Sequence, residues 1–182
     1  MINFFIMIGL LFSINPLFSH SPNEVSFSIY KEDTFILVDA EFPWSLRNAV
    51  FMYDSTLNNQ STFQDIQNSL FRYIEANLII KAENEEILKL LKVTDKKGKS
   101  HHEEYQLVFE KKTIKSIRNT LLFNFSSKQK NFHVLDVNEQ KTEFVLTKDN
   151  PEITFEAESS ISYLWFLLGG IVLLLGLFFY KS

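Results

Sequence analysis

The chain contains no cysteine among its 182 residues. A disulfide framework, a thiolate metal site and a cysteine nucleophile are therefore excluded. The sequence also lacks a glycine-rich phosphate loop, a nucleophile elbow and an HExxH helix, which are short motifs that point directly to an enzyme class. The formal net charge of -4 argues against a nucleic-acid binder, because such proteins carry an excess of basic residues.

Histidine is scarce as well, with four residues in the whole chain. This leaves little material for general acid–base chemistry, and we expect a protein that is not an enzyme. A membrane-tethered hydrolase stays open as an alternative, because a Ser–His–acid set is assembled in space and leaves no fixed spacing in the sequence.

A long apolar run, Tyr163–Tyr180, contains no charged residue. A helix of this length spans roughly 27 Å, close to the hydrocarbon thickness of a bilayer. We predict a single transmembrane helix, residues 163–180, followed by a cytoplasmic tail, residues 181–182. Without ionisable residues the helix cannot carry an ion relay. The expected anchor residues are its interfacial rings and its small residues, which permit close helix packing: Tyr163, Trp165, Gly169, Gly170, Gly176 and Tyr180.

Residues 1–19 have the layout of a secretory signal peptide. Ile2–Leu11 is apolar, Pro16 ends any helix, and Ser19 is a small residue before the expected cleavage site, although no basic residue lies near the start. An uncleaved N-terminal anchor is the alternative. Cleavage after Ser19 would make His20 the first residue of the mature chain.

The residues between these two ends form one predicted domain, 20–156, followed by a polar stalk, 157–162. The domain is long enough to bury one hydrophobic core. The signal peptide and the anchor together predict a single-pass membrane protein whose N-terminal domain is extracytoplasmic. The composition, rich in Lys, Asn, Ile and Phe, favours a bacterial protein and a periplasmic location.

Alternating apolar residues predict most strands of this domain. Val25, Phe27 and Ile29 alternate with polar residues, whereas Thr34–Ala40 is apolar on both faces and favours a central strand. The pattern at Ile87–Val93 fits a bulged strand or one helical turn, and the turn sequence that follows favours the strand. Further strands are expected at Leu78–Ala82, Tyr105–Phe109, Leu121–Phe125, Phe132–Val137, Phe144–Leu146 and Ile153–Phe155.

One helix is strongly indicated over Thr62–Ala76. Ser61 and Gln64 fit a capping box, and apolar residues then follow at helical spacing. A shorter helix is expected over Trp44–Phe51, with Pro43 near its first turn. The fold class that follows is mainly β: an antiparallel, immunoglobulin-like β-sandwich with one inserted helix, joined to a single C-terminal transmembrane helix.

The densest group of metal-ligating residues is His101-His102-Glu103-Glu104. Neighbouring strand residues point to opposite faces, so each face receives only two ligands, and a solvated start of a strand is the favoured interpretation. A mature N-terminal His20 would offer an imidazole and an α-amino group to copper or nickel. We expect no cofactor, with a transition metal held by His20, His101 and His102 as the alternative.

Two other polar groups are interpreted as surface. His133 and Asp136 are three residues apart and would not share a face of a regular strand. The lysines concentrated between Lys89 and Lys115 indicate solvated hairpin edges that discourage pairing with other chains, and a face resting on anionic headgroups is the alternative.

The order of these features resembles one kind of bacterial protein. A signal ending before His20 leads into the strands EVSFSIY and TFILVDAEFPW, and a helix then runs into IEANLIIKAENEEI. Over His20–Leu91 this pattern resembles the extracytoplasmic N-terminal domain of HupE/UreJ-type proteins and similar small exported domains of unknown function. The resemblance implies a periplasmic β-rich domain connected with metal handling. Those proteins have several membrane helices with ionisable residues, whereas this chain has one apolar helix, so no transport residues are carried over.

Together these features predict a non-enzymatic, single-pass membrane protein whose extracytoplasmic domain is a binding module and an accessory subunit of a membrane complex. The expected partners are the lipid bilayer and another membrane protein, and not nucleic acid. The first alternative is a metal-binding accessory domain centred on His20, and the second is a membrane-tethered hydrolase.

Overall fold

The computed structural model describes residues 23–96, 102–137 and 140–155. Within these ranges the domain is mainly β, as predicted. Its elements, in chain order, are β1 (Glu24–Lys31), β2 (Phe35–Phe42), α2 (Leu46–Tyr53), α3 (Phe63–Asn77), β3 (Leu78–Ala82), β4 (Leu90–Asp95), β5 (Glu103–Glu110), β6 (Ile114–Asn119), β7 (Lys130–Val137), β8 (Gln140–Thr147) and β9 (Glu152–Thr154).

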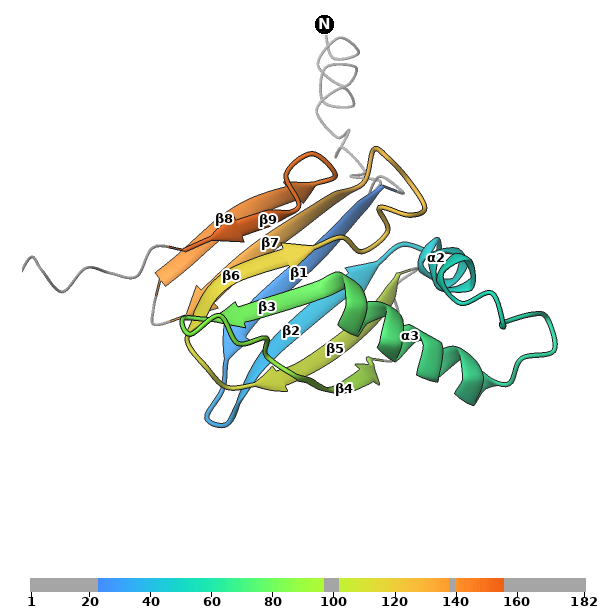
Figure 1. The fold of residues 1–182 in the computed structure, drawn as a ribbon, viewed down its shortest axis with the longest axis horizontal. Coiled ribbons are helices and arrows are strands. Elements are labelled where there is room, and N and C mark those ends of the chain that lie inside the picture. Colours follow the sequence, from blue (N-terminus) through green and yellow to red (C-terminus); the bar gives the residue numbers. More distant parts are fainter. Residues whose placement is uncertain (1–22, 97–101, 138–139, 156–182) are drawn as a thin grey trace, which may run out of the picture.

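The described strands form two sheets (Figure 1). The larger sheet has the order β4-β5-β2-β1-β7-β8, and the smaller has the order β3-β6-β9. Strands β1 and β7 pair in parallel, with Phe27 opposite His133, and the other pairs are antiparallel. The predicted antiparallel arrangement is therefore wrong for the β1–β7 pair and correct for the other described pairs. An immunoglobulin domain consists of antiparallel sheets, whereas here the chain returns to β1 only after both helices and two strands of the smaller sheet.

One apolar core lies between the two sheets. The alternation of β1 turns Val25, Phe27 and Ile29 inward, and each is 1% exposed. Ile80 of β3 and Ile117 of β6 belong to the same buried cluster. Burial of each such side chain contributes roughly 1.5–3 kcal/mol, so the sheets are held together mainly by this core.

The apolar character of β2 reflects its central position. It pairs with β1 on one side and with β5 on the other. Inward Val38 is fully buried, and outward Leu37 is only 6% exposed. The strand ends at Phe42, because Pro43 has no backbone N–H to donate to a neighbouring strand.

Two helices follow β2, and they confirm the short helix predicted over Trp44–Phe51 and the longer one over Thr62–Ala76, although the predicted fold class counted one inserted helix. The cap of α3 lies one residue later than the predicted Ser61–Gln64 pair. Thr62 Oγ1 accepts from the Asp65 backbone N–H at 3.2 Å, and Asp65 Oδ2 accepts from the Thr62 N–H at 2.9 Å. The Ser61 hydroxyl is used in the preceding turn, where it accepts from the Asn58 N–H.

The strand predicted over Leu121–Phe125 is absent from the described structure, and that segment is a turn. Leu122 takes a left-handed conformation with φ of 65°, and its carbonyl accepts from the N–H groups of Phe125 and Ser126. The neighbouring strand of the smaller sheet is β6, Ile114–Asn119, which the sequence analysis did not predict. Its isoleucines are three residues apart and give no period of two.

No helix within the described residues is long and apolar enough to cross a bilayer. The predicted signal peptide, stalk and anchor, including Tyr163, Trp165, Gly169, Gly170, Gly176 and Tyr180, lie outside the described residues.

Candidate functional site

A cleft of about 470 Å³ opens between the two helices and the adjoining ends of β4 and β5. Residues of α2 and α3 form one wall, and it is mostly apolar. The opposite wall comes from the end of β4 and the start of β5, and it is mostly charged. The cleft therefore suits a ligand that has both an apolar part and a charged part.

The apolar wall continues the stripe of α3. Phe63, Ile66 and Leu70 follow at helical spacing and so lie along one side of the helix. Leu70 is 3% exposed and rests against the core, whereas Phe63, at the first turn, is 72% exposed. Leu46 and Val50 of α2 are buried beneath them. A large ring left in solvent above an apolar floor is the kind of feature that marks a binding surface.

Among the described residues, two cations line the cleft: Lys96 on the charged wall and Arg47 of α2 on the opposite wall. Lys96 Nζ lies 2.6 Å from Asp39 Oδ2 on the larger sheet. The guanidinium of Arg47 lies 5.4 Å from the ring centroid of Phe51, in a cation–π contact. The Arg47 charge acts on Glu103 and lowers its pKa, but burial outweighs this effect, so the pKa of Glu103 is raised overall.

Two of those carboxylates are Asp95 and Glu103. Within the described part of the chain, neither forms an ion pair. The Tyr105 hydroxyl donates to Glu103 Oε2 at 3.3 Å. Burial raises the pKa of the Glu103 carboxyl, and the charge of Asp95 raises it further. The cleft thus holds two acidic groups whose charges disfavour one another.

The cleft and the last described residue, Phe155, lie at opposite ends of β5. Glu103 begins the strand at the cleft, and Glu110 ends it roughly 24 Å away. Near that far end, Glu86 pairs with Lys112 at 2.5 Å. The Phe155 N–H donates to the carbonyl of Lys115, which is three residues after Lys112, at 2.7 Å. In Figure 1, β9 lies toward the left, while the helices lie on the right.

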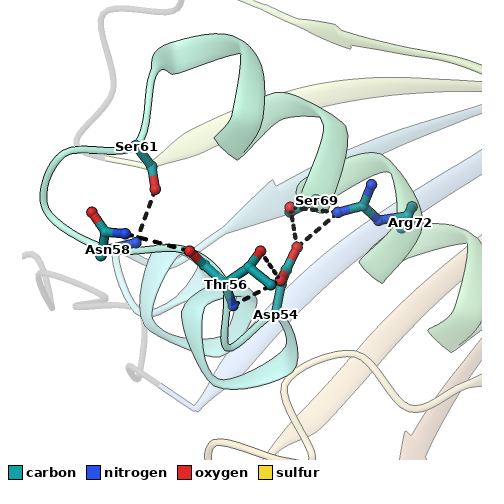
Figure 2. Close-up of polar contacts among 6 residues, drawn as sticks. All are labelled: Asp54, Thr56, Asn58, Ser61, Ser69 and Arg72. Atoms are coloured by element: carbon teal, nitrogen blue, oxygen red, sulfur yellow. Dashed lines mark hydrogen bonds and ion pairs between the residues drawn. The ribbon is translucent and has the colours of Figure 1, made fainter.

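A second depression, of about 430 Å³, lies beside the loop between α2 and α3. At its centre Asp54 Oδ2 accepts from Ser69 Oγ at 2.5 Å and from Arg72 Nη2 at 2.7 Å, and Oδ1 accepts from Thr56 (Figure 2). These bonds, that from Ser69 first, hold the pKa of Asp54 well below its usual range. Because these groups already satisfy one another's hydrogen bonds, we interpret the cluster as a structural contact that fixes the loop to α3.

The interpretation of His133 as a surface residue is wrong, because its side chain is 1% exposed. Its ring stacks between Phe27 and Phe144, with both centroid distances at 4.8 Å. Its Nδ1 lies 2.9 Å from the carbonyl of Asn131, which can only accept, so Nδ1 carries the proton. Nε2 then accepts from the Asn119 amide of β6 at 3.0 Å. Burial lowers the pKa of His133 to about 4. This histidine joins the two sheets as a neutral core residue.

The side of β7 that faces the core is therefore not the expected one, because His133 was expected to point outward. Asn131, His133 and Leu135 point into the core, whereas Phe132 is 37% exposed and Asp136 is exposed, as predicted for that residue. The polar side chains are tolerated inside because they bond to one another: Asn131 Nδ2 donates to the Asn119 side chain at 3.0 Å.

Of the three candidate metal ligands, His20 and His101 lie outside the described residues. His102 lies beside the cleft, with Nε2 at 3.9 Å from a Glu41 carboxylate oxygen. No group of three or more metal-ligating side chains is assembled within the part of the chain that the structure describes. The metal site stays a prediction.

The sequence pattern did not single out the cleft's apolar wall. An apolar stripe along a helix ordinarily indicates burial against a core, and the sequence alone does not show that the first turn of α3 extends beyond the sheet. It did single out His102, Glu103 and Glu104, as a ligand cluster, and the structure places these three residues on the charged wall.

No model of a known protein family matches the chain, and a search of curated proteins finds no significant match. The resemblance to HupE/UreJ-type proteins remains a prediction.

Proposed function

We propose that the chain is a non-enzymatic, membrane-tethered binding module. Its β-sandwich would stand outside the cytoplasm, and the cleft between α2, α3 and the β4–β5 strand ends would bind a segment of a partner protein. The main support is the exposed Phe63 ring above an apolar floor, facing Asp95 and Glu103, which have no ion pair within the described structure. We infer that such a module would serve as an accessory subunit of a membrane complex.

The position of the cleft relative to the predicted anchor supports a cleft that faces away from the bilayer. The stalk and predicted anchor would begin after Phe155, and residues 156–162 reach at most roughly 25 Å when fully extended. The bilayer would therefore lie near the β9 end of the domain, and the cleft would face away from it. A cleft so placed would meet a soluble protein or the extracytoplasmic part of a membrane protein, rather than lipid.

Site-specific photo-crosslinking in the native cells tests the proposal. A benzoylphenylalanine residue is placed at Phe63, in the cleft, or at Ile87, which is 57% exposed near the far end of the domain. We expect one discrete adduct from position 63 and none from position 87. The adduct from position 63 should also be lost when the cleft floor is blocked by Val50→Trp.

Equal adducts from both positions, or none from position 63 in cells that express the chain, would contradict the assignment of the cleft. Circular dichroism of the purified Val50→Trp chain distinguishes a blocked cleft from an unfolded domain, because the variant should keep the β-rich spectrum.

A further inference from the structure

We propose that the segment bound in the cleft carries a large apolar side chain close to a lysine or an arginine. This inference rests on the proposed function, since it names the chemistry of the partner that the cleft accepts. It is drawn from the two walls of the cleft, which differ in chemistry.

The apolar wall accounts for the first half of the motif. Phe63 is exposed, while Leu70 and Val50 close the floor below it. An aromatic or branched side chain inserted here would be covered on one side by the floor and on the other by the Phe63 ring. Buried anchors of this kind supply most of the binding energy of protein interfaces.

The charged wall accounts for the second half. Asp95 of β4 lies directly opposite Tyr105 of β5, and Glu103 is two residues before Tyr105 on the same strand. Residues opposite one another or two apart share a face of a sheet, so the Asp95 and Glu103 carboxylates lie on the same side. A cation placed between them would relieve their repulsion, and a guanidinium would match both with paired hydrogen bonds.

Among the described residues, the two cations that line the cleft do not fully neutralise this pair. Lys96 pairs with Asp39. Arg47 lies over the Phe51 ring, and its charge lowers the pKa of Glu103 without offsetting the effect of burial. The charge complement is therefore expected from the bound segment. The short separation of the two walls, which line one cleft of about 470 Å³, places the cation within a few residues of the apolar anchor.

Peptide selection tests this chemistry without a known partner. The full chain, held in lipid nanodiscs, is panned with a phage library of random dodecapeptides. The most enriched peptide is synthesised with a fluorescent label, and its Kd is measured by polarisation. We expect enriched sequences with an aromatic or aliphatic residue within about two positions of Lys or Arg. Raising NaCl from 50 to 500 mM should weaken binding.

The key variant is Asp95→Asn with Glu103→Gln, which keeps side-chain shape and removes both charges. We expect roughly tenfold weaker binding or more, the effect of losing charge-assisted hydrogen bonds. The matched control is Glu32→Gln with Asp33→Asn, two exposed carboxylates in the β1–β2 turn at the far end of β5. The control should bind like the unchanged chain.

The outcomes separate this inference from the proposed function. Enriched peptides without a basic residue that still require Phe63 would overturn the charge chemistry and leave the cleft as a binding site. Unchanged binding by the Asp95→Asn, Glu103→Gln chain would also overturn the charge chemistry and leave the cleft as a binding site. A selection that yields no peptide dependent on Phe63 would overturn this inference, while the crosslinking from position 63 judges the proposed function independently.

Discussion

His133 makes the stability of the domain depend on pH. The ring is buried between Phe27 and Phe144 and is bonded to Asn119 and to the carbonyl of Asn131. All four neighbours are uncharged. A proton added to this ring would place a positive charge among apolar rings, and it would also break the bond to the Asn119 amide, because Nε2 could no longer accept.

The size of the effect follows from the shift in pKa. Burial lowers the pKa of His133 from 6.5 to about 4 in the folded chain. Between these values the unfolded chain binds a proton that the folded chain does not bind, so stability is lost as the pH falls. At about 1.4 kcal/mol per pH unit, the difference between these two pKa values amounts to about 3 kcal/mol. The contribution is fully present above pH 6.5 and is gone below about pH 4.

The assay is urea denaturation of the chain in mild detergent, followed by near-ultraviolet circular dichroism, at pH values from 7.5 to 4. A comparison with His133→Gln isolates the contribution of this ring. The free energy of unfolding of the unchanged chain should fall by about 3 kcal/mol more than that of the variant. His102→Gln, at the partly exposed histidine beside the cleft, is the control and should keep the full pH dependence.

Equal pH profiles for the unchanged chain and His133→Gln would refute this account. If the variant does not fold, NMR of the histidine-labelled chain decides instead. The ring signals of His133 should show the neutral form at pH 5. A titration midpoint near 6.5 for His133 would show that its ring is not buried as described.

Three further predictions concern other contacts. Tyr73→Phe should lower the free energy of unfolding by roughly 1–3 kcal/mol, because its hydroxyl serves two partners in or near the core, and Tyr53→Phe at an exposed ring should have little effect. Asp54→Asn should lower the unfolding temperature more than Asp33→Asn, measured by thermal circular dichroism. The pKa of Asp54 is depressed, so its contribution should be lost as the pH falls below about 3.8. Phe63→Ser should change stability by less than about 0.5 kcal/mol yet abolish selection of cleft-binding peptides.

Elements whose signal is local could be predicted from the sequence. The alternation of Val25, Phe27 and Ile29 identifies β1, and the two-sided apolar pattern identifies β2 as central. The stripe from Phe63 to Leu70 identifies α3. The bulge expected in Ile87–Val93 is found as a register shift between Leu90 and Lys92 of β4. In each case the residues of one segment determine its structure.

Features that depend on distant partners could not be predicted. The inward face of β7 carries Asn131 and His133 because Asn119, twelve and fourteen residues earlier, bonds to both. Without those partners the apolar Phe132 would be the expected inward residue. The parallel pairing of β1 with β7 has the same origin, since no local pattern encodes a strand returning after about 100 residues.

The candidate site was predicted only in part. The acidic cluster at Glu103 and Glu104 is visible in the sequence, but its role depends on Asp95 across the strand pair and on Phe63 from a separate helix. A spacing rule for metal ligands could not reveal an apolar wall facing these carboxylates.

The most direct test of the central claim, that the cleft faces outward and is occupied by a partner, uses the absence of native cysteine. Single cysteines are introduced as Phe63→Cys or Ile87→Cys, and each is labelled with a membrane-impermeant maleimide in intact cells and after purification. We predict that both positions react in intact cells, with position 63 reacting severalfold more slowly there than after purification, and position 87 reacting equally in both. No labelling in intact cells at either position, or equal rates for position 63 in both preparations, would contradict the claim.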